Sequence, residues 1–201
     1  MPHAEPTSAM LDQIDGVLRL LDREVWVVTA ADGSRRGGLA ATWVSPASIH
    51  RERPVLLAAI APNHFTAELI DASQAFAAHL LRADQAAVAW NFAAGSSRQR
   101  DKFAGLATTT SAGGSPLLAD CRAWCDCRVI TRYDTGDRLL FWADVVAAGQ
   151  PGSGPPLREQ GFIRNLSPEQ RQQLTLDKLA DIAVQRPLHR QWRAGADPAN
   201  D

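Results

Sequence analysis

The sequence predicts a mainly β (α+β) protein whose centre is an antiparallel barrel with flanking helices. Short apolar segments rich in Val, Leu and Ala are separated by turn residues. Ala31-Asp32-Gly33 is a hairpin signal that joins two of these segments. Strands and helices do not alternate regularly, which favours the barrel over its alternative, an α/β sheet.

Apolar periodicity and turn residues place the individual elements. Apolar residues at helical spacing predict an amphipathic helix over Met10–Leu21, which Thr7 or Ser8 would cap and which would cover one end of the sheet. Pro46 is expected to end or bulge the second strand because it cannot donate to a ladder. The expected strands are Glu24–Ala30, Gly37–Ser48, Val55–Ala61, Ala75–Leu81, Cys121–Arg132 and Leu139–Ala147. Further helices are expected over Phe65–Ala72, from a cap at Asp84 through Phe92, and after the capping sequence Ser167-Pro168-Glu169-Gln170.

The chain is long enough for one substantial core, and we expect a single domain over residues 1–201. Its parts are an N-terminal helix (1–22), a barrel (23–148) and a C-terminal helical extension (157–193) that follows a Gly/Pro-rich linker. The composition of the tail from Gly195 predicts disorder.

Composition excludes several classes of protein. The formal net charge of −1 gives no basic balance for nucleic acid, and the apolar runs are shorter than the ~20 residues of a membrane span. The N-terminus does not resemble a secretory signal. Cys121, Cys125 and Cys127 are clustered and odd in number, which suits a reducing cytoplasm. Without a second cysteine cluster they are expected to be core residues and not metal ligands.

The stretch Gly37–Ser48 is unusual for a core strand. It begins with two glycines, continues with small residues and carries Thr42, Trp43 and Ser45, where a buried strand would be rich in Val, Ile and Leu. Small residues let a partner approach the backbone closely. A flat ligand with polar edges would explain this composition.

Two loops carry the hydroxyls and cations that a phosphate requires. One contains Asn63 and Thr66, and the other contains Ser97, Arg98 and Lys102. Neither matches a nucleotide fingerprint, so spacing alone favours solvated polar loops. His64 lies beside the first loop and is the better functional histidine, whereas the apolar setting of His79 predicts a core histidine. Nothing in the sequence indicates a nucleophile elbow or a catalytic triad.

Read together, these segments resemble the flavin reductase-like, FMN-binding split-barrel family, and its flavoredoxin-like members in particular. The resemblance extends over about three quarters of the chain, roughly 24–173, on an alignment by eye. Its landmarks, in order, are Gly38-Leu39 with Thr42-Trp43, Ser45-Pro46-Ala47-Ser48, Arg53–Leu57, Phe65–Ile70, Phe76–Leu81, Ser97-Arg98, Asp101–Gly105 and Gly136-Asp137-Arg138. Three positions depart from the family pattern: Ala40, where a hydroxyl residue is common, Pro46, and Arg138, where many members have histidine.

The resemblance implies bound FMN in an antiparallel split β-barrel with a C-terminal helical extension. The flavin ring would lie along the second strand, and the ribityl chain and phosphate would lie between the two polar loops. The implied cofactor-binding residues are Ala40, Ala41, Thr42, Trp43, Val44, Ser45, Asn63, His64, Phe65, Thr66, Ser97, Arg98, Lys102 and Phe103. Arg138 is a candidate nicotinamide contact, no other catalytic residue is expected, and no metal is expected.

The resemblance also implies a cytoplasmic homodimeric flavoprotein with the flavin near the dimer interface. The first hypothesis is an NAD(P)H-dependent flavin reductase, an oxidoreductase that moves hydride from nicotinamide C4 to FMN N5 and supplies a monooxygenase or another redox protein. The alternative is a flavoredoxin-like electron carrier with tightly bound FMN and a protein redox partner. A third hypothesis is a barrel that binds another planar cofactor such as haem, with His64 or His79 as the axial ligand to test.

Overall fold

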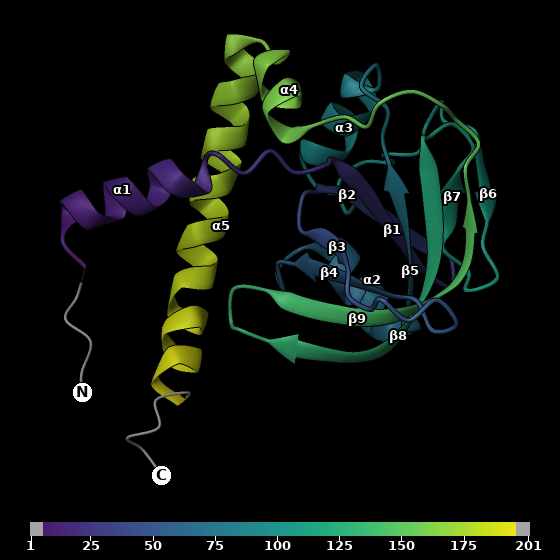
Figure 1. Cartoon of the computed structure of the whole chain (residues 1–201), viewed down its shortest axis with the longest axis horizontal. Coiled ribbons are helices and arrows are strands. Elements are labelled where there is room, and N and C mark those ends of the chain that lie inside the picture. The colour runs from purple at the N-terminus through teal and green to yellow at the C-terminus, as the bar shows by residue number, and fades with distance from the viewer. Residues whose placement is uncertain (1–5, 196–201) are drawn as a thin grey trace.

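The computed structural model describes residues 6–195, and its centre is a seven-stranded antiparallel sheet that curls into a half-barrel (Figure 1). The order of the strands in this sheet is β2-β1-β5-β8-β9-β4-β3. The strands are β1 Trp26–Asp32, β2 Arg35–Ala41, β3 Val44–Pro46, β4 Val55–Ile60, β5 Ala75–Leu80, β8 Ala123–Asp134 and β9 Leu139–Gly149. The predicted split barrel is confirmed.

The segment expected as a single second strand is two strands at opposite edges of the sheet. β2 pairs with β1, whereas β3 pairs with β4. The chain therefore crosses the open side of the half-barrel at Thr42 and Trp43. The expectation of one continuous strand was wrong because strand propensity does not show where a chain changes partners. Pro46 ends β3, as predicted.

The helices are α1 Ser8–Leu18, α2 Phe65–Ser73, α3 Ala86–Ala93, α4 Glu159–Arg164 and α5 Pro168–Gly195. Thr7 caps α1 by accepting a hydrogen bond from the Met10 amide at 3.3 Å, as predicted. However, no residue of α1 is buried, and the helix projects away from the sheet (Figure 1). The expectation that it covers one end of the sheet was wrong: its periodicity shows an apolar face but not what that face contacts.

Two apolar clusters fill the barrel. One lies between the sheet and α2 and includes Phe76 and Phe141, and the other lies around α3 and includes Phe92 and Phe103. Phe92 meets Phe103 edge-on, with ring centroids 5.4 Å apart. A Cβ atom on Gly38 would lie only 2.7 Å from the Phe92 ring, so the small residue brings β2 against α3.

His79 and the cysteines belong to this interior. His79 Nδ1 donates to the Val27 carbonyl at 3.0 Å and Nε2 accepts from the Leu118 amide at 3.1 Å, which fixes a neutral imidazole. Burial lowers the pKa of His79 to about 4. Cys121 and Cys127 are buried free thiols, and burial raises the pKa of both. Within residues 6–195 no three or more His, Cys, Asp or Glu side chains gather as metal ligands would.

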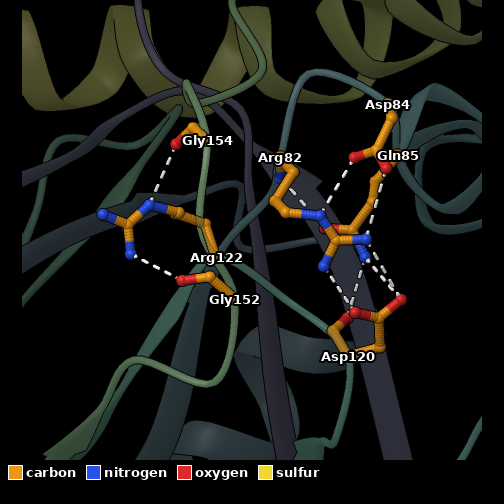
Figure 2. Close-up of polar contacts among 7 residues, drawn as sticks. All are labelled: Arg82, Asp84, Gln85, Asp120, Arg122, Gly152 and Gly154. Atoms are coloured by element: carbon orange, nitrogen blue, oxygen red, sulfur yellow. Dashed lines mark hydrogen bonds and ion pairs between the residues drawn. The ribbon is translucent and has the colours of Figure 1, made fainter.

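The Gly/Pro linker is held on the barrel by the side chain of Arg122 (Figure 2). Arg122 donates to the carbonyls of Gly152 and Gly154 at 2.9 and 3.0 Å. Arg82 pairs with Asp84 and Asp120 beside it. These contacts fix the path of the linker and therefore the start of α4 and α5. Asp84 faces Arg82 and does not cap α3, whose N-cap residue is Gln85; that prediction was wrong.

Three further features complete the fold. A two-stranded sheet, β6 Thr108–Thr110 with β7 Pro116–Leu118, was not expected from sequence. Ser167 caps α5 reciprocally with Gln170, as predicted: each residue's amide donates to the other's side chain, at 2.9 and 3.2 Å. None of the helices described between residues 6 and 195 has the length and apolar character of a membrane span. The predicted disordered tail, from Gly195 onward, lies almost wholly outside the described residues.

Candidate functional site

A small cavity of about 160 Å³ opens where the chain crosses from β2 to β3. Small side chains on β2 and β4 leave its floor open to a flat group. It is lined by Leu39, Ala40, Ala41, Thr42, Trp43, Ala59, Ile60, Ala61, His64, Arg138 and Asp181. The structure thus brings the middle of the predicted ring-binding stretch together with His64 and Arg138.

Trp43 projects at the rim of this cavity and is 45% exposed. The Arg138 guanidinium lies 5.0 Å from its ring centroid, and that of Arg23 lies 5.9 Å away. Arg138 also donates to the Gln185 side chain at 2.7 Å. A planar indole between two guanidinium groups is an anchor for a flat or anionic partner at the mouth of the cavity.

A larger cavity of about 440 Å³ continues from the first and shares Leu39, Ala40, His64 and Asp181 with it. Lys102 lines it and is only 2% exposed, and its Nζ donates to the Phe92 carbonyl at 2.7 Å. Among the described residues no carboxylate pairs with Lys102 in a salt bridge. Burial, with the nearby charge of Arg100, lowers the pKa of Lys102 to about 8. A buried ammonium of this kind favours an anionic ligand.

The N-terminus of α2 faces the same cavity through Phe65 and Thr66. His64 is the N-cap residue of this helix but makes no side-chain capping bond, so the first-turn amides of the helix lack the usual side-chain acceptor. Free amides and the helix dipole both favour an anion there. This end of the cleft therefore suits the phosphate that the two polar loops predicted.

The remaining predicted site residues lie outside the two cavities, apart from Ser97. Its hydroxyl both donates to and accepts from the Gly38 backbone at 3.2 Å, so it ties its loop to β2 at the edge of the larger cavity. Arg98 pairs with Glu68 and lies over the Phe65 ring, with 4.7 Å from guanidinium carbon to ring centroid. Val44 and Phe103 are buried, and Ser45 is exposed and donates to the Pro46 carbonyl.

Sequence reasoning missed the contribution of α5. Asp177 and Asp181 line the larger cavity, and Gln185 lies one helical turn further along. Asp181 accepts hydrogen bonds from Asn63 at 2.7 Å and from His64 at 2.9 Å, and these lower its pKa. The spacing of the three residues, four apart, places them on one helix face and was the available signal.

The donor set can be tested against a flavin mononucleotide. The two connected cavities together offer a narrow end with small side chains and a wider end with a buried cation and free helix amides. An isoalloxazine ring requires the first kind of environment and a phosphate the second. The residues of the barrel therefore fit the group, whereas the two carboxylates of α5 oppose its charge.

The comparison with protein families identifies the family of this chain. The model of the flavin reductase like domain matches residues 18–160, which is more than half of the chain. The chain belongs to the flavin reductase-like family. Membership supports a flavin-dependent oxidoreductase. The match ends at residue 160, so α5, which carries Asp181, lies outside the matched residues.

This flavin reductase-like protein is similar to curated flavoproteins. Diflavin flavoprotein A 1 of Synechocystis is 28% identical over 122 residues, which is 60% of this chain and 21% of the relative. The chain thus spans about a fifth of the length of that curated relative.

Solved structures agree with the fold. A homologue of nitrilotriacetate monooxygenase component B from Mycobacterium thermoresistibile is 28% identical, with a TM-score of 0.65 over 75% of this chain and 84% of that one. Another similar structure is the NADH:FAD oxidoreductase of Streptomyces globisporus in complex with NAD and FAD fragments. It is 23% identical, with a TM-score of 0.68 over 83% of this chain and 99% of that one. At that identity the likeness shows the fold alone.

Proposed function

We propose that this protein is an NAD(P)H:flavin oxidoreductase that binds FMN in the connected cavities. The observation that carries the proposal is Lys102, a buried ammonium with one carbonyl partner that faces the larger cavity beside the N-terminus of α2. Asp177 attracts this ammonium across the cavity, but no described carboxylate forms a salt bridge with it, and a phosphate would supply that direct countercharge. The likeness to monooxygenase component B supports a role in supplying a partner oxygenase.

Each wall of the cleft would then have a distinct task. FMN, when bound, would accept and release hydride at its ring. The backbone of Ala40–Thr42 would position the ring edge, and amide donors there stabilise negative charge on a reduced ring. Asn63, Thr66 and Lys102 would hold the ribityl chain and the phosphate. Arg138 and Trp43 at the mouth form the surface that a nicotinamide would contact.

The test is to measure FMN binding and nicotinamide oxidation separately. We expect FMN to raise the melting temperature and quench tryptophan fluorescence, and FMN-loaded protein to oxidise NADH or NADPH under steady-state conditions. If FMN changes neither the melting temperature nor the fluorescence of the protein, the result contradicts flavin binding. A protein that binds FMN but oxidises neither nicotinamide contradicts only the choice of donor.

That second result would favour the electron-carrier alternative, which one observation supports. Arg138 is engaged by Gln185 and Trp43, so this candidate nicotinamide contact already has partners. A protein donor would need no such contact. Reduction of the bound flavin by a reduced ferredoxin, with no reduction by NADH or NADPH, is the expected behaviour of such a carrier.

We further propose that the protein is a cytoplasmic homodimer and that α1 lies in the interface. Isolated helices below ~12–15 residues are marginal in water, and α1 has 11 residues with none buried. A second copy of the chain would cover Ile14, Val17 and Leu18, which line a shallow apolar groove. Light scattering should give the mass of a dimer for the native chain. The Ile14→Asp variant should give the mass of a monomer, whereas Asp12→Asn on the same helix should leave the dimer intact.

A further inference from the structure

Asp181 is the residue of α5 that reaches both cavities. Its two carboxylate oxygens accept one hydrogen bond each, from the Asn63 amide and from the His64 ring. Both donors lie at the N-terminus of α2, where the proposed function places a phosphate. A carboxylate thus uses the donors that phosphate oxygens would use.

The rest of α5 shows that this contact is polar. After Leu174, whose side chain packs against the core, four large apolar residues of the helix are exposed, Leu176, Leu179, Val184 and Leu188, while Ile182 is half-buried. The contacts toward the cleft are the two to Asp181 and those of Gln185, which donates to Asn63 at 3.0 Å and accepts from Arg138 at 2.7 Å. The Asp181 side chain is 34% exposed, so its contacts are individually weak, whereas Gln185 is buried and holds the helix more firmly.

We propose that Asp181 is an internal mimic of the ligand phosphate and a determinant of ligand specificity. When α5 is docked, its carboxylate occupies Asn63 and His64. A ligand that carries a phosphate must displace it, whereas a ligand without a phosphate does not compete for these donors. The inference rests on the proposed flavin site and adds a competitor that lies outside the residues matched by the family model.

Charge supports competition over cooperation. The hydrogen bonds from His64 and Asn63 lower the pKa of Asp181, so the carboxylate is anionic at neutral pH. An anion and a phosphate repel each other when both lie in the same cleft. Both cannot remain on the same donors. Binding therefore includes the cost of releasing α5, and a minor competent population weakens the apparent affinity in proportion.

The experiment compares two ligands and two variants by flavin fluorescence quenching. The ligands are FMN and riboflavin, which share the ring and ribityl chain and differ in the phosphate. The variants are Asp181→Ala and the control Asp177→Ala, which removes the same charge from the same helix without touching Asn63 or His64. If docked α5 is populated about nine times in ten, Asp181→Ala should tighten FMN about tenfold more than Asp177→Ala does. Riboflavin affinity should be the same in both variants.

Hydrogen exchange of α5 amides supplies a readout that needs no ligand activity. FMN should accelerate exchange in the 176–186 segment of the wild-type protein, and riboflavin should not. Equal tightening of FMN and riboflavin in Asp181→Ala overturns the mimic, because the helix is then a steric cover. Unchanged or weaker FMN binding in that variant also overturns it while leaving the flavin function standing. If no form of the protein binds FMN, both the mimic and the proposed function fail.

Discussion

The two walls of the cleft are built in opposite ways. The barrel wall buries its apolar side chains fully, as Leu69, Phe76 and Phe92 show. The α5 wall exposes Leu176 and Leu179 and presents carboxylates to the cleft. Burial of a large apolar side chain stabilises a fold by ~1.5–3 kcal/mol, whereas a typical hydrogen bond contributes ~0.5–1.5 kcal/mol. The barrel wall is thus the more fully buried half of the site, and α5 is the more exposed half, which we propose that a ligand displaces.

Removal of a core ring from the barrel wall should have the largest effect. Phe92 is fully buried between Phe103 and β2, so Phe92→Ala leaves a cavity and should lower the free energy of unfolding by about 3–5 kcal/mol. Urea denaturation measures this loss. Leu179→Ala on the exposed face of α5 is the matched control and should change it by less than about 0.5 kcal/mol. Similar losses in the two variants would contradict the difference between the walls.

The barrel should also respond to acid through His79. Its pKa is about 4 in the folded chain against an ordinary 6.5, so the neutral ring favours the folded state. The unfolded chain binds a proton first as pH falls, and stability present above pH 6.5 is lost between pH 6.5 and 4. The difference corresponds to roughly 3 kcal/mol.

Urea denaturation between pH 4 and 6.5 measures the contribution of His79 to the free energy of unfolding, and NMR titration of the ring measures its pKa. A ring that titrates near pH 6.5 in the folded protein would contradict this contribution.

Lys102 tests the ligand side of the barrel wall. Lys102→Ala should weaken FMN binding by roughly 1.5–3 kcal/mol, the worth of one charge-assisted hydrogen bond. Lys102→Met should weaken FMN binding by as much, because methionine keeps the aliphatic volume of the side chain but not its charge. Lys178→Ala, an exposed cation on α5, should leave binding unchanged.

The same ammonium predicts a pH dependence of FMN affinity. The pKa of Lys102 is about 8, so its side chain loses its positive charge as pH rises through that value. The affinity for FMN should therefore fall. Isothermal titration at pH 7 and pH 9 measures the change. Affinity that is flat with pH would remove Lys102 from the phosphate site.

The barrel was largely predictable because its signals are local. The Asp32-Gly33 turn, the break at Pro46 and the reciprocal cap of Ser167 and Gln170 each follow from the chemistry of adjacent residues. The small residues Ala40, Ala41 and Thr42 led to the prediction of a flat ligand there, and they line one of the cavities. These features require no knowledge of distant partners.

The missed features depend on contacts between distant segments. Strand propensity could not show that β2 and β3 lie at opposite edges, because both halves of the segment are equally extended. The periodicity of α1 predicted that the helix has an apolar face but could not show that this face is exposed. Asp181 meets Asn63 and His64 across more than a hundred residues, and no local pattern specifies that meeting.

The smallest expected effect, on the local stability of α5, tests most directly whether α5 and the barrel unfold independently. Ser167→Ala removes the hydroxyl that accepts from the Gln170 amide at the start of α5 and should cost about 1 kcal/mol of local helix stability. If α5 is attached separately, its amides should exchange about fivefold faster while the free energy of unfolding of the barrel stays the same. Ser167→Asp, another good N-cap, should restore protection. Equal loss of protection in β1 and β5 would instead show that α5 and the barrel unfold as one cooperative unit, since a cap acts on the barrel only through such coupling.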